Sequence, residues 1–134
     1  MEKMIRRAAK LKISSHFHFT GFLKGENVDR MFAMSDVYVM PSVSEPFGIS
    51  PLEAMRSNVP VVISKQSGVA EVLNHVMKVD FWDVDAMADA IYGLLHYDSL
   101  NSMFVNLGTE EVNNLKWESA SRKVADIYES LLHS

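Results

Sequence analysis

Short apolar runs alternate along the chain with longer segments in which apolar residues recur at helical spacing. Residues 36–40 and 59–63 are apolar on both faces, and a third short run falls at 77–79. Strands with this pattern are buried on both sides, as in a parallel sheet that helices cover on both faces. The pattern therefore predicts an α/β fold with right-handed crossovers between its strands.

Helical periodicity fills the stretches between these runs and continues after them. Asp83 can cap the clearest of these helices, and Asn27 can cap an earlier one. The apolar stripe after Asp83 consists of Val84, Met87, Ala88, Ile91, Leu94 and Leu95. The other predicted helices cover residues 2–11, 48–57, 68–74, 99–112 and 117–131.

One more strand is predicted near the amino terminus, at residues 16–20, where His, Phe, His, Phe and Thr alternate. Parallel sheets bind ligands beyond the carboxyl ends of their strands. We therefore expect the loops at 20–22, 45–53 and 64–68 to meet at one rim of the sheet.

Two carboxylates flank the middle one of these loops. Glu45 precedes the turn at Gly48, and Glu53 lies inside the helix that the turn opens. The unpaired N–H groups of a helix start, together with the helix dipole, suit the oxygens of a phosphate group. One acid can then face a sugar and the other a ribose, which predicts a site for a sugar nucleotide. The alternative is that both acids are solvated surface residues.

Composition narrows the classes of protein that fit. The chain has 134 residues with 48% hydrophobic content, which indicates a single globular domain over residues 1–134. The net charge of −4 makes nucleic acid an unexpected ligand, because proteins that bind it usually carry excess positive charge. The absence of cysteine and of a signal-like apolar segment favours a cytoplasmic protein. No metal-like spacing links the histidines, which we interpret as structural or surface residues: His16, His18, His75 and His96.

Taken in order, these motifs closely resemble the C-terminal domain of retaining GT-B glycosyltransferases of the family-4 type. The resemblance covers the chain from its first helix to the helix at Trp117. The similar segments are FTGF at 19–22, SDVYVMPS at 35–42, EPFG at 45–48, LEAM at 52–55, PVV at 60–62 and SGVAE at 67–71. It implies a Rossmann-like parallel sheet with helices on both faces.

The resemblance also implies roles for individual residues. Glu45 would be catalytic beside the donor hexose, and Glu53 would take the ribose hydroxyls. The backbone of Phe47, Gly48 and Ile49 would contact the sugar and the diphosphate, although Phe47 could equally be a core residue. Further candidate donor contacts are Gly21, Phe22, Ser67 and Gly68. Ser67 departs from the family, whose turn is richer in glycine here. The family implies no metal and no cofactor besides the nucleotide-diphosphate sugar as substrate.

The C-terminal domain of that family starts with a strand, a loop with an Arg–Lys pair, a helix and a second strand. No motif in this sequence matches them. In the family's strand order this gap falls between the strands at 16–20 and 36–40. We therefore expect a partial domain, inactive alone, whose partner is the missing N-terminal region of the full-length protein. Its exposed sheet edges would favour self-association. Peripheral membrane association of the full-length protein is left open.

Three functions fit these features. The first is the donor-binding part of an enzyme that moves a hexose from a nucleotide-diphosphate sugar to an acceptor with retention of configuration. The second is a non-catalytic nucleotide-sugar-binding or pairing module. A GT-B epimerase is third, although it would use a different arrangement of acids and histidines. Lys65 could reach a phosphate or could simply be solvated.

Overall fold

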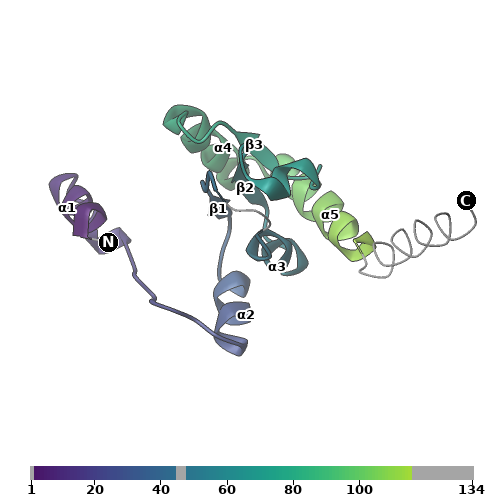
Figure 1. Ribbon diagram of the computed structural model, residues 1–134, viewed down its shortest axis with the longest axis horizontal. Coiled ribbons are helices and arrows are strands. Elements are labelled where there is room, and N and C mark those ends of the chain that lie inside the picture. Colours follow the sequence, from purple (N-terminus) through teal and green to yellow (C-terminus); the bar gives the residue numbers. More distant parts are fainter. Residues whose placement is uncertain (1, 45–47, 116–134) are drawn as a thin grey trace, which may run out of the picture.

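A computed structural model describes residues 2–44 and 48–115 of the chain (Figure 1). Within them, β1 (Tyr38–Met40), β2 (Val61–Ser64) and β3 (Met77–Val79) form one parallel sheet in that order. All three strands fall inside or beside the apolar runs from which they were predicted. The predicted parallel α/β architecture is therefore confirmed.

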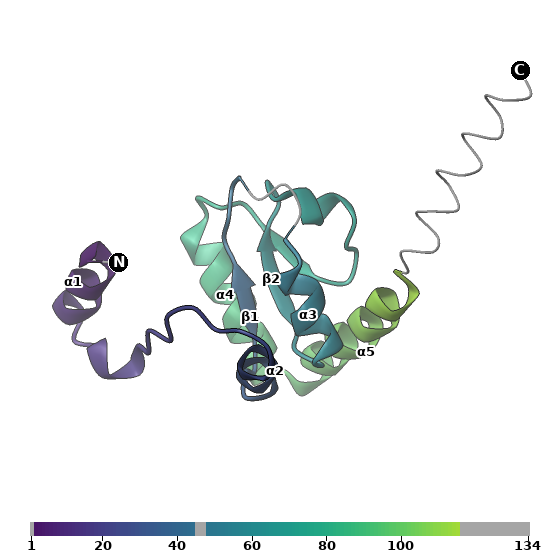
Figure 2. The ribbon, with the colours of Figure 1, turned by 60° about the horizontal axis from the view of Figure 1, so that its bottom comes forward.

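Helices cover both faces of this sheet. On one face lie α2 (Glu26–Ala33) and α3 (Ser50–Arg56), and on the other lies α4 (Val84–His96), as Figure 2 shows for α3 and α4. The last described helix, α5 (Asp98–Asn114), packs against both α3 and α4. The crossovers that parallel strands require thus place a helix layer on each side.

Alternating side chains of β2 build the two halves of the core. Val61 and Ile63 belong to the cluster on the α3 side, whereas Val62 packs with Ala90 and Leu94 of α4. The three β2 side chains are at most 1% exposed. Burying a side chain of this size contributes about 1.5–3 kcal/mol, so β2 is the centre of the hydrophobic core.

The strand predicted at residues 16–20 is wrong. A short 3-10 helix, η1 (Ser14–His16), occupies its start, and no regular element is assigned from there to α2. Phe17 does adopt the extended backbone that the alternation favours, with φ −104° and ψ 130°. An extended segment becomes a strand only when a neighbouring strand takes up its hydrogen bonds. Within the described part of the chain, no strand pairs with this segment.

Of the two predicted helix caps, one is confirmed and the other is wrong. Asp83 caps α4, because its Oδ1 accepts a hydrogen bond of 2.9 Å from the Ala86 amide. The cap predicted at Asn27 is wrong, since α2 begins at Glu26. Gly25 precedes it with φ 55°, a backbone conformation in the positive-φ region that favours glycine.

Two other predicted helices differ in type or in the face that they bury. Residues 68–74 form a 3-10 helix, η2 (Gly68–Glu71), rather than an α-helix. In α4 the buried side is narrower than the predicted stripe, because Val84 is 72% and Leu95 49% exposed. The predicted helix at 117–131 lies outside the described residues.

The first helix, α1 (Glu2–Lys10), forms where the sequence predicts it, but it lies apart from the sheet (Figures 1 and 2). Ala8 is buried, while Met4 is 61% exposed. Among the described helices, none is long and apolar enough to cross a lipid bilayer.

Candidate functional site

The carboxyl ends of β1 and β2 point to the same edge of the sheet, because the two strands are parallel and hydrogen-bonded to each other. In Figure 2 this is the upper edge, where the chain leaves β2 for η2. Neighbouring strands are about 4.8 Å apart, so the two exits lie within reach of one small ligand. This rim is the position at which open α/β sheets bind ligands.

The first exit leads from β1 to α3. Gly48 is buried there, Ile49 is 64% exposed, and the amides of both Leu52 and Glu53 donate to the Ile49 carbonyl oxygen. Tyr38 Oη donates to Ser50 Oγ over 2.8 Å, which ties β1 to the first residue of α3. The start of the helix is thereby held at the rim.

The candidate acids belong to this exit. Glu53 is exposed on α3, four positions after Ile49. Glu45 and Phe47 lie outside the described residues. The proposed pairing of Glu45 with Glu53 across the turn therefore stays a prediction.

The second exit contains Ser67 and Gly68. Ser67 is 2% exposed, and its hydroxyl donates to the Ser64 carbonyl oxygen over 2.8 Å. Its backbone is extended, with φ −78° and ψ 143°, so this position does not require glycine. The departure from the glycine-rich family turn therefore causes no backbone strain.

A hydrogen-bonded network joins this exit to the end of β3. Gln66 Nε2 donates to Asp80 Oδ1 over 2.8 Å, and Lys65 Nζ lies 3.1 Å from Asp80 Oδ2. The hydrogen bond from Gln66, followed by the hydrogen bond and the charge of Lys65, holds the pKa of the Asp80 carboxyl below its usual value. Lys65, for which phosphate contact or solvation was left open, makes an ion pair here.

The third predicted loop does not join the rim. Gly21 and Phe22 lie in the segment between η1 and α2, which runs away from the sheet in both ribbon views. Phe22 is 86% exposed, with Lys24 Nζ 5.4 Å from its ring centroid. The expected meeting of three loops is therefore wrong for residues 20–22, and donor contact by Gly21 and Phe22 stays a prediction.

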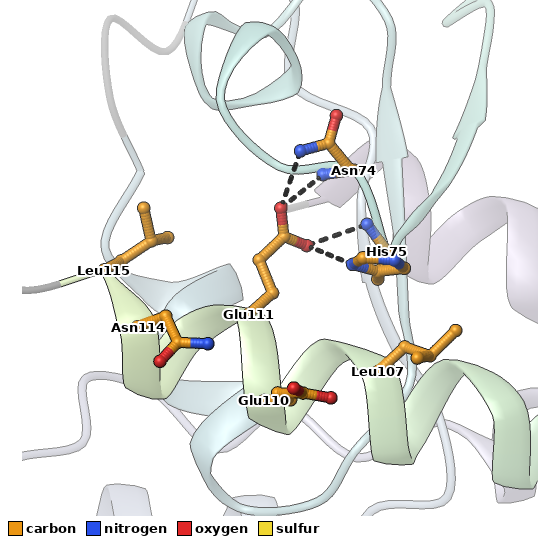
Figure 3. A pocket seen from close by; sticks show the side chains of 7 residues that line it. All are labelled: Asn74, His75, Leu107, Glu110, Glu111, Asn114 and Leu115. Atoms are coloured by element: carbon orange, nitrogen blue, oxygen red, sulfur yellow. Dashed lines mark hydrogen bonds and ion pairs between the residues drawn. The ribbon is translucent and has the colours of Figure 1, made fainter.

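A separate cleft of about 410 Å³ lies between α5 and the connection that leads into β3 (Figure 3). Glu111 points from α5 into this connection, where its carboxylate accepts from the backbone and side chains of Asn74 and His75 at 2.8–3.0 Å. These residues precede β3, at the end of that strand opposite the rim. His75, interpreted from the sequence as a structural or surface residue, makes a structural contact here.

Sequence reasoning missed Glu111, although the sequence contains a signal for it. Glu111 and Val112 lie three and four positions after Gly108, so both are neighbours of Gly108 on the surface of α5. Gly108 and Val112 are buried, which places an acid on the buried stripe of the helix. A carboxylate on such a stripe needs hydrogen-bond partners.

Across the described residues, no group of three or more metal-binding side chains is close enough to hold an ion.

Comparison with known proteins agrees with the geometry of the fold. Residues 1–111 match the family model described as Glycosyl transferases group 1. The structure is similar to sucrose-phosphate synthase from Thermosynechococcus elongatus with a TM-score of 0.81 and 24% identity, over 98% of this chain and 34% of that protein. This likeness shows the GT-B type of fold.

The curated relatives are, by their names, transferases of sugars. An uncharacterised glycosyltransferase of Methanocaldococcus jannaschii is 30% identical over 115 residues, which are 82% of this chain and 29% of that protein. A sulfoquinovosyl transferase of Arabidopsis thaliana is 32% identical over 79% of this chain and 22% of its own length. A phosphatidyl-myo-inositol mannosyltransferase of Mycobacterium leprae is 30% identical over 89% of this chain and 33% of its own length.

The chain thus spans between a fifth and a third of the length of these relatives. The family match covers α1 to Glu111 and includes both exits of the rim. The chain belongs to the family Glycosyl transferases group 1.

Proposed function

We propose that this chain binds the nucleotide-diphosphate sugar donor of a retaining hexosyltransferase at the rim formed by the β1 and β2 exits. The observation that carries the proposal is that the family match includes both exits, and that the sheet places them side by side. The relatives are longer, so the proposal for this chain concerns donor binding. It assigns neither the acceptor nor the transfer step to this chain.

In this proposal Glu45 lies beside the donor hexose, and Glu53 accepts from the ribose hydroxyls. A carboxylate can accept from two neighbouring hydroxyls at once, and negative charge near the ring stabilises an oxocarbenium-like transition state. The exposure of Glu53 supports its role, because the side chain is accessible to a ligand from solvent.

Backbone groups would hold the diphosphate. At the start of α3 the Leu52 and Glu53 amides already donate to the Ile49 carbonyl oxygen and Pro51 has no N–H, so the candidate donors are the Gly48, Ile49 and Ser50 amides. On the neighbouring exit the Ser67 amide already donates to the Ser64 carbonyl oxygen, so the Gly68 amide is the candidate donor there. No metal ion and no cofactor is assigned to this site.

Calorimetric titration of the 134-residue chain with UDP, GDP, ADP and their sugars tests the proposal directly. We expect one of the diphosphates to bind and Glu53→Ala to weaken its binding about tenfold, which corresponds to the loss of one charged hydrogen bond. Glu110→Ala, an exposed acid on α5, is the matched control and should bind as the wild type does. Equal affinities of the wild type and Glu53→Ala would remove the ribose role of Glu53.

A further inference from the structure

Gln66 occupies the centre of the turn between β2 and η2. Its Oε1 accepts from Ser64 Oγ at 2.8 Å and from the Phe81 amide at 3.1 Å, while its Nε2 donates to Asp80 Oδ1 at 2.8 Å. Its own amide donates to Ser64 Oγ over 3.1 Å. One side chain thus links the end of β2 to the end of β3.

Asp80 completes the link. Its second oxygen, Oδ2, pairs with Lys65 Nζ at 3.1 Å, and the Lys65 amide donates to the Val79 carbonyl over 2.8 Å. Both oxygens of this carboxylate therefore hold the turn that follows β2. Hydrogen bonds to a charged group are about twice as strong as neutral ones, so Asp80 is an effective anchor.

The turn held in this way leads directly to the second exit of the rim. Ser64, just before the turn, is 0% exposed, and Ser67 within it is 2% exposed. Ser67 Oγ donates back to the Ser64 carbonyl oxygen. Within the described residues, no buried side-chain oxygen or nitrogen lacks a hydrogen-bond partner. The turn is therefore held by hydrogen bonds within the chain, and pre-organisation of this kind lowers the entropic cost of binding a ligand.

We propose that Gln66 and Asp80 are positioning residues that hold the Gly68 amide in the geometry that a donor diphosphate needs. The inference rests on the proposed function, because that function assigns the diphosphate to this exit. Neither side chain contacts the ligand in this scheme. Both act through the Lys65–Gly68 turn, and their own pairing sets its shape.

An exchange of the amide and the carboxylate tests this pairing. Gln66→Glu places two carboxylates against each other, and Asp80→Asn removes the charged acceptor. The double variant Gln66→Glu/Asp80→Asn restores one amide facing one carboxylate with unchanged total charge. Asp89→Asn, which removes an exposed acid on α4, is the control.

Amide hydrogen exchange and calorimetry are then measured on the 134-residue chain and these four variants. We expect the Gln66, Ser67 and Phe81 amides to exchange about tenfold faster in Gln66→Glu, and close to the wild-type rate in the double variant. The Leu94 amide of α4 should keep its rate, which separates loosening of the turn from unfolding. UDP, GDP or ADP affinity should fall and recover in parallel.

Measurement at lower pH adds a second test, because one of the two facing carboxyls in Gln66→Glu takes up a proton as the pH falls. The defect of Gln66→Glu should therefore shrink in acid, whereas a purely steric defect would persist. Unchanged exchange in both single variants, or no recovery in the double variant, would overturn the proposal. Altered exchange with equal nucleotide affinity in all proteins would also overturn it. If the wild type binds no diphosphate, the proposed function fails, while exchange still reports whether the pairing holds the turn.

Discussion

Ser67 occupies a position at which the family resemblance leads one to expect glycine. Its φ of −78° lies in the ordinary range, so the missing glycine costs nothing in backbone strain. The hydroxyl instead adds a bond to the Ser64 carbonyl in a place that is almost fully buried. The turn after β2 is thus held by a serine hydroxyl at a position where the resemblance leads one to expect glycine.

We predict that Ser67→Gly, the change toward the family pattern, destabilises the chain by about 1–2 kcal/mol. Roughly 1 kcal/mol comes from the lost hydrogen bond, and the rest from the greater freedom of glycine in the unfolded chain. Urea unfolding measures the difference. Ser102→Ala, at an exposed site on α5, should change stability by less than about 0.5 kcal/mol. A Ser67→Gly protein as stable as the wild type would show that the hydroxyl has no structural role.

At the scale of the element, Glu111 joins α5 to the connection between η2 and β3. Burial raises the pKa of its carboxyl, but the hydrogen bonds from His75 and Asn74 outweigh burial and bring the pKa below the ordinary 4.5. A carboxyl with a lowered pKa stabilises the fold fully above its unfolded value. This contribution is lost as the pH falls through the folded value.

Glu111→Gln should therefore lower the free energy of unfolding near neutral pH by about 1–2 kcal/mol, because a charged acceptor is replaced by a neutral amide. Below pH 4.5 the wild type loses the same contribution, so the two proteins should converge in stability. Urea unfolding across this range measures the convergence. The neighbouring exposed acid gives the control Glu110→Gln, which should follow the wild type throughout. A constant difference between wild type and Glu111→Gln would contradict the linkage.

The elements also show what a single sequence can predict. The three strands and the helices α3, α4 and α5 follow from apolar runs and periodicity, because these patterns record local burial. The strand expected at 16–20 fails, since a strand depends on a neighbour that local alternation does not encode. For the same reason the links from Gln66 to Asp80 and from Asn74 to Glu111, 14 and 37 positions apart, were not predicted. The rim was predicted in outline, and its supporting bonds required the structure.

At the scale of the whole molecule, β1 is an edge of the sheet within the described residues. The Tyr38 amide donates to the Pro60 carbonyl toward β2. Alternate residues of a parallel strand bond to opposite sides, so the Val39 N–H and C=O point to the outer edge. Exposed edges of this kind promote pairing with another chain.

We predict concentration-dependent self-association of the wild type in sedimentation velocity experiments. Val39→Pro should reduce it, because proline removes the outer N–H and leaves the bonds to β2 in place. Val39→Thr keeps that N–H and a β-branched side chain, so it should associate as the wild type does. A wild type that stays monomeric at every concentration, or equal association of the two variants, would contradict the role of this edge.

The central claim, that the rim of the sheet binds a nucleoside diphosphate, is tested most directly by backbone NMR of the labelled chain titrated with UDP, GDP and ADP. We expect one of these ligands to shift the amides of Gly48, Ile49, Ser67 and Gly68 together, while the amides of Asn74 and His75 at the opposite end of β3 stay unchanged. Shifts confined to the Asn74–His75 cleft, or none with any of the three ligands, would contradict it.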